Sequence, residues 1–329
     1  MVNAAFWKDK RVLVTGGAGF VGRWVGRALV AAAAELHILD IVPPKHVAEP
    51  FALHRADLRD LDAATHLLEE TRPDAIIHLA GQPGVSVSHD QPVSAYESNV
   101  LATFNLLEAA RRMTAAQAGG RGVPLAIVAV SSNHVYGHQP AEGRQATPES
   151  AALNGLGMYA ATKLCGDVLA RCYGKSYGVP VGIARMTNSY GGDDHHVGHI
   201  ITGSILSTLR GERPVIKQSG RDRKGYLYIE DTVDGLLAVA EGVAGSPQLA
   251  GEAFNLVPDE AITTLELVRA IVAAADSALE PIVQLPDAPH EAEFLDNTKA
   301  RQLLGWKPRH DLRAGLRKTI AWYRRSSGA

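Results

Sequence analysis

The sequence Arg-Val-Leu-Val-Thr-Gly-Gly-Ala-Gly-Phe-Val-Gly, residues 11–22, decides the fold. A short apolar run ends at Thr15, and glycines then recur at every third residue, at Gly16, Gly19 and Gly22. After them, apolar residues return at helical spacing. The pattern predicts a strand, a tight glycine turn and a helix whose N-terminus binds a pyrophosphate, because free N–H groups and the helix dipole favour negative charge there.

Strand and helix patterns continue to alternate along the chain. In the first half, strands are expected at residues 11–15, 35–40, 75–79 and 125–130, helices at 21–34, 61–71, 93–112 and 157–177, and a loop at 114–124. Later strands are expected at 181–185 and 225–229, and later helices at 200–211, 231–241 and 265–275, with two short helices around residues 306–308. This alternation predicts an α/β protein with a Rossmann-type, doubly wound parallel sheet. We expect residues 1–180 to form a dinucleotide-binding domain and residues 181–329 a smaller α/β substrate-binding portion, with some segments shared.

The composition argues against several classes of protein. Lysine and arginine number 33 and the acidic residues 35, so no basic field for nucleic acid or for a membrane surface is expected. The N-terminal segment carries charges before a single short apolar run, which is typical of neither a signal peptide nor a spanning helix. Cys165 and Cys172, the two cysteines, lie on one predicted helix and are interpreted as reduced thiols of a cytoplasmic protein.

Asp40 is expected at the end of the strand that follows the glycine helix. A carboxylate there accepts hydrogen bonds from ribose hydroxyls and repels a 2′-phosphate. The next residues, Ile41, Val42 and Pro43, provide no arginine to bind that phosphate. The sequence therefore favours NAD over NADP as the cofactor.

Tyr159 and Lys163 stand four residues apart, on one face of a predicted helix. A free tyrosine has a pKa near ~10 and is a poor base at neutral pH. A neighbouring ammonium and the positive nicotinamide lower that pKa, so the phenolate can remove a hydroxyl proton while hydride leaves the same carbon. Ser131 and Ser132 follow an expected strand, at the sheet edge where ligands bind in open α/β sheets.

With these residues in view, the chain resembles the NAD-dependent epimerase/dehydratase family, the extended short-chain dehydrogenases that act on nucleotide sugars. The resemblance covers nearly the whole chain and rests on the glycine motif at 15–22 and on matching stretches at 57–58, 78–81, 98–100, 131–137, 159–163, 185–191, 228–231 and 304–308. Within the family, residues 185–241 and 251–323 are most similar to the CDP-glucose 4,6-dehydratase-like branch.

The resemblance implies a role for each matching position. NAD would be held by Gly16, Gly19, Phe20, Val21, Gly22, Asp40, Ile41, Asp57, Leu58, Leu79, Ala80, Gly81, Asn99, Tyr159 and Lys163. The nucleoside-diphosphate sugar would be contacted by Gln82, Ser132, Asn188, Arg223 and Lys224. Two copies of the chain would pair through the helices near 93–112 and 157–177, and the family needs no metal.

The two residues after Ser132 depart from the family pattern. Family 4,6-dehydratases carry an aspartic acid there, which protonates the leaving C6 hydroxyl, and then a base that removes the C5 proton. This chain has Asn133 and His134. An amide does not donate a proton, so water loss from C6 lacks its acid. His134 is either an acid or base, since imidazole titrates near neutrality, or a side chain that fills the site and hydrogen-bonds the substrate.

A second departure concerns the diphosphate. The family usually has an arginine and then an aspartate before the aromatic residue at this point, with the arginine on a phosphate, and Lys224 and Gly225 occupy those two places in this chain. Arg223 or Lys224 is expected to bind the diphosphate instead, although a lysine is a point charge and not a fork.

A run of histidines and aspartates follows the expected strand end near residue 190. The run comprises Asp193, Asp194, His195, His196 and His199. Its spacing fits no closed zinc pattern, so a substrate loop is expected rather than a metal site.

The expected function is NAD-dependent epimerisation of a nucleotide sugar, at C4, through a transient 4-keto sugar and tightly bound NAD(H). The alternatives are a 4,6- or related dehydratase with His134 as base, and net oxidation by dissociable NAD. A non-catalytic NAD-binding sensor is the alternative from another class, and such a protein would be expected to lack Tyr159 or Lys163.

Overall fold

A seven-stranded parallel sheet forms the centre of the protein, in a computed structural model that describes residues 2–42, 49–116, 126–137, 146–288, 290 and 292–326. The strands lie in the order β11 (Ala253–Leu256), β6 (Val181–Met186), β5 (Ala126–Ser132), β4 (Ala75–His78), β1 (Arg11–Thr15), β2 (Glu35–Leu39) and β3 (Ala52–His54). Because β1 pairs with both β2 and β4, the chain order reverses there, which is where open α/β sheets bind ligands. The predicted Rossmann-type sheet is confirmed.

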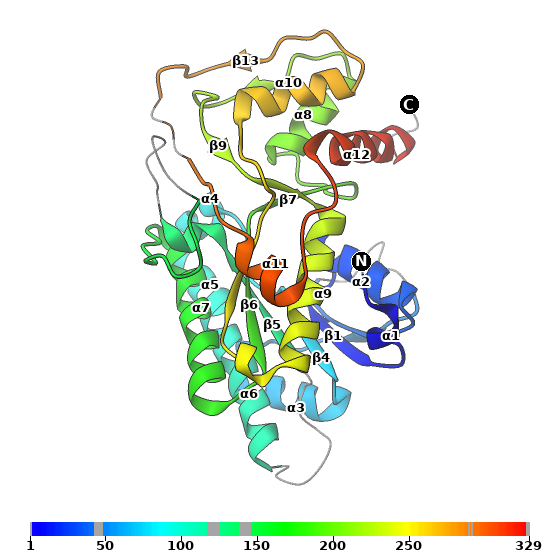
Figure 1. The fold of residues 1–329 in the computed structure, drawn as a ribbon, viewed down its shortest axis with the longest axis vertical. Helices are drawn as coiled ribbons and strands as arrows, with labels where there is room; N and C mark the ends of the chain where they lie inside the picture. Colours follow the sequence, from blue (N-terminus) through cyan, green and yellow to red (C-terminus); the bar gives the residue numbers. More distant parts are fainter. Residues whose placement is uncertain are drawn as a thin grey trace.

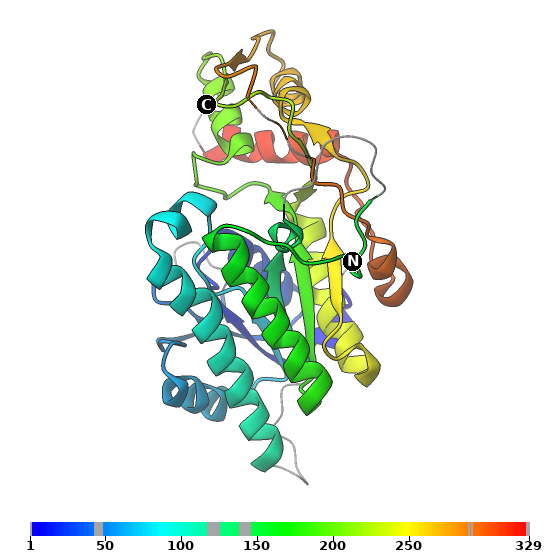
Figure 2. The same cartoon turned by 90° about the vertical axis from the view of Figure 1, so that its left-hand side faces the viewer.

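Helices cover both faces of the sheet (Figure 1). One face carries α2 (Phe20–Ala31) and α9 (Ile229–Gly245), and the other carries α3 (Leu61–Thr71), α6 (Ala102–Ala116) and α7 (Met158–Tyr177). In Figure 2, α6 and α7 lie side by side in front of the strands. Each face packs against its helices through its own cluster of buried apolar side chains, and the burial of such side chains is a large favourable contribution to stability.

Short helical segments complete this part of the chain. They are α1 (Ala4–Trp7), α4 (Val85–Asp90), α5 (Pro92–Tyr96), a π-helical turn (Glu97–Leu101), and 3-10 turns at Asn133–Tyr136 and Pro247–Leu249. The helix predicted at 93–112 is therefore present, but a π-helical turn interrupts it.

A smaller layer of helices lies above the sheet in Figure 1. It contains α8 (Ile200–Leu209), α10 (Thr264–Ala274) and α12 (Leu312–Ser326), which pack around a shared apolar cluster, while α11 (Thr298–Leu304) packs on α9. Further short strands pair outside the central sheet: β7 (Asn188–Tyr190) with β10 (Tyr226–Tyr228), β9 (Arg223–Lys224) with β12 (Ile262–Thr263), and β8 (Val215–Ile216) with β13 (Ile282–Val283).

Several predicted boundaries are wrong. The loop expected at 114–124 starts too early, since α6 continues to Ala116. The last helix was expected to be short but has 15 residues, because its apolar side packs against α8 and α10. β5 extends past its expected end at 130, because Ser131 and Ser132 still pair with β6.

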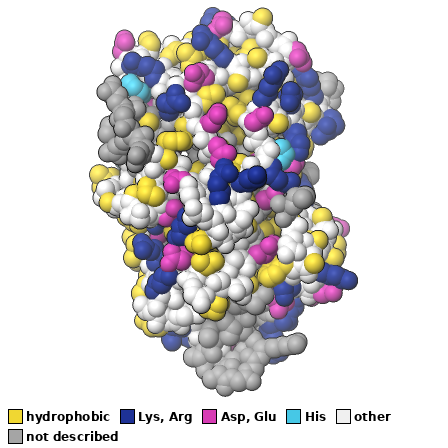
Figure 3. Space-filling model, in the orientation of Figure 1, with side chains coloured by type: hydrophobic (Ala, Val, Ile, Leu, Met, Phe, Trp, Pro, Cys, Tyr) yellow, Lys and Arg dark blue, Asp and Glu magenta, His cyan; other side chains and the backbone are white. Residues whose placement is uncertain are grey.

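The surface agrees with the balanced composition. In Figure 3, basic and acidic side chains are interspersed over the face shown. Within the described residues, no helix is long and apolar enough to cross a membrane. Cys165 and Cys172 are both exposed and carry free thiols, as predicted.

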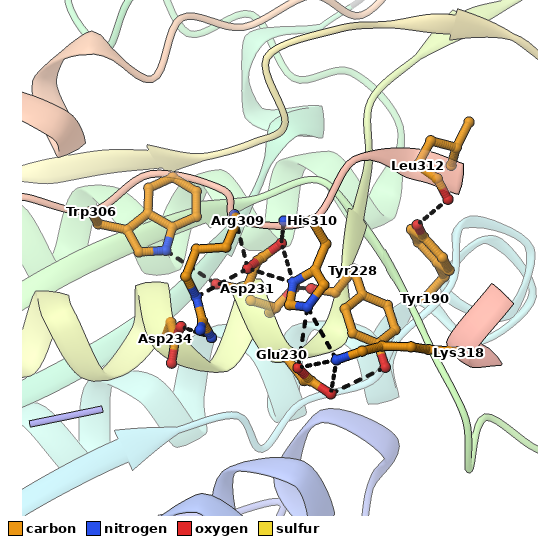
Figure 4. Close-up of polar contacts among 11 residues, drawn as sticks. Tyr190, Tyr228, Glu230, Asp231, Asp234, Trp306, Arg309, His310, Leu312 and Lys318 are labelled. Atoms are coloured by element: carbon orange, nitrogen blue, oxygen red, sulfur yellow. Dashed lines mark hydrogen bonds and ion pairs between the residues drawn. The ribbon is translucent and has the colours of Figure 1, made fainter. Parts of the chain in front are cut away.

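One buried carboxylate ties the two layers together. Asp231, in the first turn of α9, is fully buried and accepts hydrogen bonds from the backbone N–H groups of Arg309 (3.1 Å) and His310 (3.0 Å). The His310 ring lies 3.0 Å from the same carboxylate, and the Trp306 indole donates to the Asp231 carbonyl. Figure 4 shows these contacts converging on the segment between α11 and α12. Lys318 of α12 adds an ion pair with Glu230.

We predict that Asp231→Asn lowers the free energy of unfolding by about 2–3 kcal/mol, because one acceptor oxygen is replaced by an amide donor that faces other donors. Chemical denaturation measures the change. Asp276→Asn is the matched control, since Asp276 is exposed and pairs only at 3.3 Å with Arg324. Equal stability of the two variants would contradict the role of Asp231.

Candidate active site

The glycine loop between β1 and α2 is shaped by close backbone packing. Gly16 has φ +70°, and a Cβ on it would lie 2.8 Å from the backbone nitrogen of Ala80. A Cβ on Gly22 would collide with the Gly16 carbonyl. Within the described chain, no side chain caps the start of α2 at Gly19, so the first turn of the helix keeps uncapped N–H groups. This is the arrangement that binds a pyrophosphate.

Asp40 lies over this loop, where the sequence places it. Its Oδ2 accepts a hydrogen bond from the Ala18 N–H at 2.9 Å, and its Oδ1 accepts from the Val42 N–H at 3.0 Å. Ile41, which stands between Asp40 and Val42 in the sequence, is largely exposed. The carboxylate is therefore held at the carboxyl end of β2, beside the turn.

A second rim of the site follows β4. The Thr15 hydroxyl accepts from the Ala80 N–H at 3.2 Å, and a Cβ on Gly81 would lie 2.5 Å from Asn99 Oδ1. Asn99 is buried and holds both backbone groups of Gln82, at 2.8 and 3.2 Å. Asn99 therefore positions the loop that follows β4.

Asp57 and Leu58, predicted to contact adenine, lie at the start of the segment leading to α3. Asp57 makes an ion pair with Arg59 at 2.6 Å, and Arg59 also pairs with Glu97 at 2.9 Å. The hydrogen bond from Arg59 lowers the pKa of Asp57. The adenine contact stays a prediction.

Ser132, Tyr159 and Lys163 come together at the end of β5. Ser132 makes a hydrogen bond with Tyr159, and the Lys163 ammonium donates to the Val130 carbonyl at 2.8 Å. Burial raises the pKa of Tyr159, and the bond to Ser132 opposes that shift. Burial lowers the pKa of Lys163 to about 8. Burial thus disfavours charge on both groups, so a positive charge beside Tyr159 is needed to favour its phenolate.

His78 lies beneath this group, within the sheet. Its ring contacts the hydroxyls of Thr15 at 2.8 Å and Thr103 at 3.1 Å. Burial, with the charge of Lys163, lowers the pKa of His78 to about 3, so the ring is neutral. Its hydrogen bonds link Thr15 of β1 to Thr103 of α6.

We predict that Lys163→Met stabilises NAD-free protein by about 2 kcal/mol near pH 7, because the buried ammonium carries a desolvation cost. The folded pKa of about 8 lies below the ordinary 10.5, so the unfolded chain binds more protons between these values. The destabilisation by the buried ammonium is therefore greatest below pH 8 and disappears as the pH rises toward 10.5. Denaturation at several pH values measures it, with exposed Lys217→Met as control. A destabilised variant, or a gain independent of pH, would contradict this account.

Asn133 and His134 extend the site beyond Ser132. The Ser132 hydroxyl donates to Asn133 Oδ1 at 3.1 Å, and Asn133 Nδ2 donates to Glu293 Oε2 at 2.5 Å. The His134 ring lies edge-on to the Tyr159 ring, with 5.6 Å between centroids. His134 is thus next to the tyrosine, and Asn133 is bonded to a carboxylate from another layer.

Glu293 was not predicted from the sequence. The Glu293 N–H donates to the Arg223 carbonyl at 2.8 Å, and the neighbouring Phe294 carbonyl accepts from Thr147 at 2.9 Å. The segment carrying it has no regular secondary structure, so no periodicity signals which way its side chains face. Only tertiary packing brings it to Asn133.

The predicted diphosphate ligands differ in their surroundings. The Arg223 guanidinium donates to the Ala261 carbonyl at 2.8 Å, while the Lys224 ammonium lies 3.6 Å from Glu293 Oε1. Asn188, in β7, is exposed. Their contacts with a diphosphate stay predictions.

The acidic and histidine-rich run is tied to the glycine helix, which was also not foreseen. Asp193 makes ion pairs with Arg23 at 2.9 Å and Arg27 at 2.5 Å. Asp194 pairs with His199 at 2.7 Å, and the bond raises the pKa of that histidine. The arginines of α2 therefore fix this loop beside the turn that follows β1.

These features match one family of known proteins. The model of the "NAD dependent epimerase/dehydratase family" matches residues 12–256. The chain belongs to this family. It is an enzyme, and its cofactor is NAD. The described residues fit that cofactor, because the glycine turn leads into a helix start that no described side chain caps, and because the Asp40 carboxylate lies beside that turn.

Individual relatives include proteins of two activities. The chain is 33% identical over 328 residues to the UDP-glucose 4-epimerase of Mycolicibacterium smegmatis, covering 96% of this chain and 99% of that one. It is 31% identical over 336 residues to the dTDP-glucose 4,6-dehydratase of Shigella flexneri, covering 95% and 92%. The solved structure of the Thermus thermophilus UDP-glucose 4-epimerase with NAD superposes with a TM-score of 0.81 at 29% identity, covering 95% and 99%.

Proposed function

We propose that this enzyme is a nucleotide-sugar 4-epimerase that works through a transient 4-keto sugar. The observation that carries the proposal is the amide of Asn133 beside Ser132, with its N–H committed to Glu293 at 2.5 Å. An amide does not protonate a leaving hydroxyl. The ketone formed at this site is therefore reduced again instead of losing water. The M. smegmatis relative, a UDP-glucose 4-epimerase, supports the same assignment.

In this mechanism the chain moves one proton and holds the sugar. Tyr159 takes the proton of the C4 hydroxyl and later returns it, while Ser132 hydrogen-bonds the same oxygen. Lys163 holds a positive charge one helical turn away, which favours the phenolate. The glycine loop and Asp40 would hold NAD, which would supply both the acceptor and the donor of the hydride, so that no outside reductant would be needed. Asn133 and Glu293 bound the pocket beside the reacting carbon.

The second candidate is a dehydratase. The observation that favours it is the carboxyl group of Glu293 near Ser132, a possible acid supplied by another segment of the chain, together with His134 next to Tyr159 as base. The S. flexneri relative is a dTDP-glucose 4,6-dehydratase. A non-catalytic sensor has less support, because the chain has both Tyr159 and Lys163.

We also propose that the enzyme is a homodimer. Apolar side chains are exposed along α5, α6 and α7, among them Tyr96, Phe104, Met158, Val168 and Tyr177. An exposed apolar surface of this kind favours burial against a partner, and the two adjacent helices of a second copy present the same surface.

Tyr159→Phe should remove nearly all turnover, roughly 1,000-fold or more, because it deletes the group proposed to take the hydroxyl proton. NAD should remain bound, since the glycine loop and Asp40 are untouched. Turnover on a panel of UDP-, CDP-, GDP- and dTDP-sugars and the absorbance of bound cofactor measure the two effects. Tyr177→Phe, at an exposed end of the same helix, is the control. Near-full activity of Tyr159→Phe would reject the mechanism.

Asn133→Asp should convert part of the turnover into loss of water, because it places a carboxyl beside Ser132. The new carboxyl would share a proton with Glu293, and this sharing raises the pKa of the pair of carboxyl groups. Because of the raised pKa, the variant has a lower free energy of unfolding than the wild type at neutral pH. This difference becomes smaller as the pH falls. Mass spectrometry of the products and denaturation at two pH values provide the readout, with exposed Asn154→Asp as control. Products that retain full mass would show that the identity of residue 133 does not divert the reaction.

A further inference from the structure

We propose that Glu293 is a specificity-determining residue that admits neutral, hydroxylated sugars and excludes sugars carrying a carboxylate beside the oxidised carbon. The inference rests on the proposed function in taking the ligand to be a nucleotide sugar whose oxidised hydroxyl lies at Tyr159 and Ser132. Nothing in the motifs of the chain points to Glu293; its place next to the reaction comes from the fold.

A continuous line of hydrogen bonds places Glu293 beside the reacting carbon. Tyr159 bonds Ser132, Ser132 donates to Asn133 at 3.1 Å, and Asn133 donates to Glu293 at 2.5 Å. Tyr159 and Ser132 both act on the oxidised hydroxyl, so Asn133 and Glu293 border the next part of the sugar. Asn133 and Glu293 also line one small pocket, together with Thr187 and Gly225.

The carboxylate is held firmly and keeps capacity for a ligand. Its backbone N–H is bonded to the Arg223 carbonyl at 2.8 Å, and its side chain is only 14% exposed. Oε2 accepts from Asn133, whereas Oε1 has the Lys224 ammonium at 3.6 Å, beyond hydrogen-bond length. Among the described residues, Oε1 therefore retains an acceptor position, and a sugar hydroxyl is the donor that fits it.

The negative charge of Glu293 in this pocket determines which sugars bind. A carboxylate in a partly buried pocket accepts a hydroxyl strongly and repels a second carboxylate. Glu260 lines the same pocket and adds a second acidic group, while Lys224 offsets part of the negative charge. A hexose with a free hydroxymethyl group therefore binds, and the corresponding uronic acid is rejected.

Binding to the NAD-loaded protein tests this without requiring turnover. UDP, CDP, GDP and dTDP are first titrated by calorimetry, and the tightest nucleotide is used as its glucose ester, its glucuronate ester and the nucleoside diphosphate alone. We expect the wild type to bind the glucose ester about 10- to 100-fold more tightly than the glucuronate ester, the size of one charged hydrogen bond.

Glu293→Gln should bring the two affinities within about threefold, because glutamine still accepts from Asn133 but carries no charge. Lys224→Met should widen the preference, since the carboxylate loses its counter-charge, and this variant tests the idea even if the first does not fold. Exposed Glu280→Gln should leave the ratio unchanged. A residue that only supported Asn133 would weaken both esters equally and leave their ratio intact.

The proposal is overturned if the wild type binds both esters equally, if Glu293→Gln keeps the full preference, or if Lys224→Met leaves or narrows it. Failure of the proposed function gives a different result. An enzyme that never epimerises but shows the predicted ratios would reject the 4-epimerase assignment and retain Glu293 as the selector.

Discussion

The hydroxyl of Ser132, at the carboxyl end of β5, is the contact on which the site depends. It is bonded to Tyr159 of α7, it donates to Asn133 at 3.1 Å, and it accepts from the His134 N–H at 3.2 Å. β5 lies near the middle of a parallel sheet, so the position of this hydroxyl is set by pairing on both sides. Tyr159, Asn133 and His134 are therefore all placed relative to one strand end.

Burial has opposite effects on stability and on chemistry at this strand end. The sheet that places Lys163 also desolvates its ammonium, which lowers its pKa to about 8 and costs stability. The same desolvation keeps Tyr159 protonated until a positive charge stands beside it. Stability is recovered elsewhere, at contacts such as Asp231, where a buried carboxylate is satisfied by two backbone N–H groups and an imidazole.

The sequence predicted the parts of the site that follow from local rules. The glycine turn, Asp40 and the pairing of Tyr159 with Lys163 depend on strand ends and helical spacing, which a sequence displays directly. Glu293 and the ion pair between Arg23 and Asp193 could not be predicted. The two members of the latter pair are separated by 170 residues, and Glu293 lies 160 residues from Asn133, so only the packing of one layer on the other brings them together. Strand β5 was predicted too short for a related reason, since its last pairs are made with β6.

The fate of the 4-keto sugar is the central claim, and the product formed by the wild-type enzyme in deuterated water tests it most directly. The protein is incubated with the nucleotide-sugar panel, and the products are analysed by mass spectrometry and NMR. A C4 stereoisomer of unchanged mass and without deuterium is predicted, because Tyr159 and bound NAD(H) act only at the oxidised carbon. Loss of one water, or deuterium incorporated at carbon, would contradict the 4-epimerase assignment and would identify Glu293 or His134 as an acid or base of the reaction.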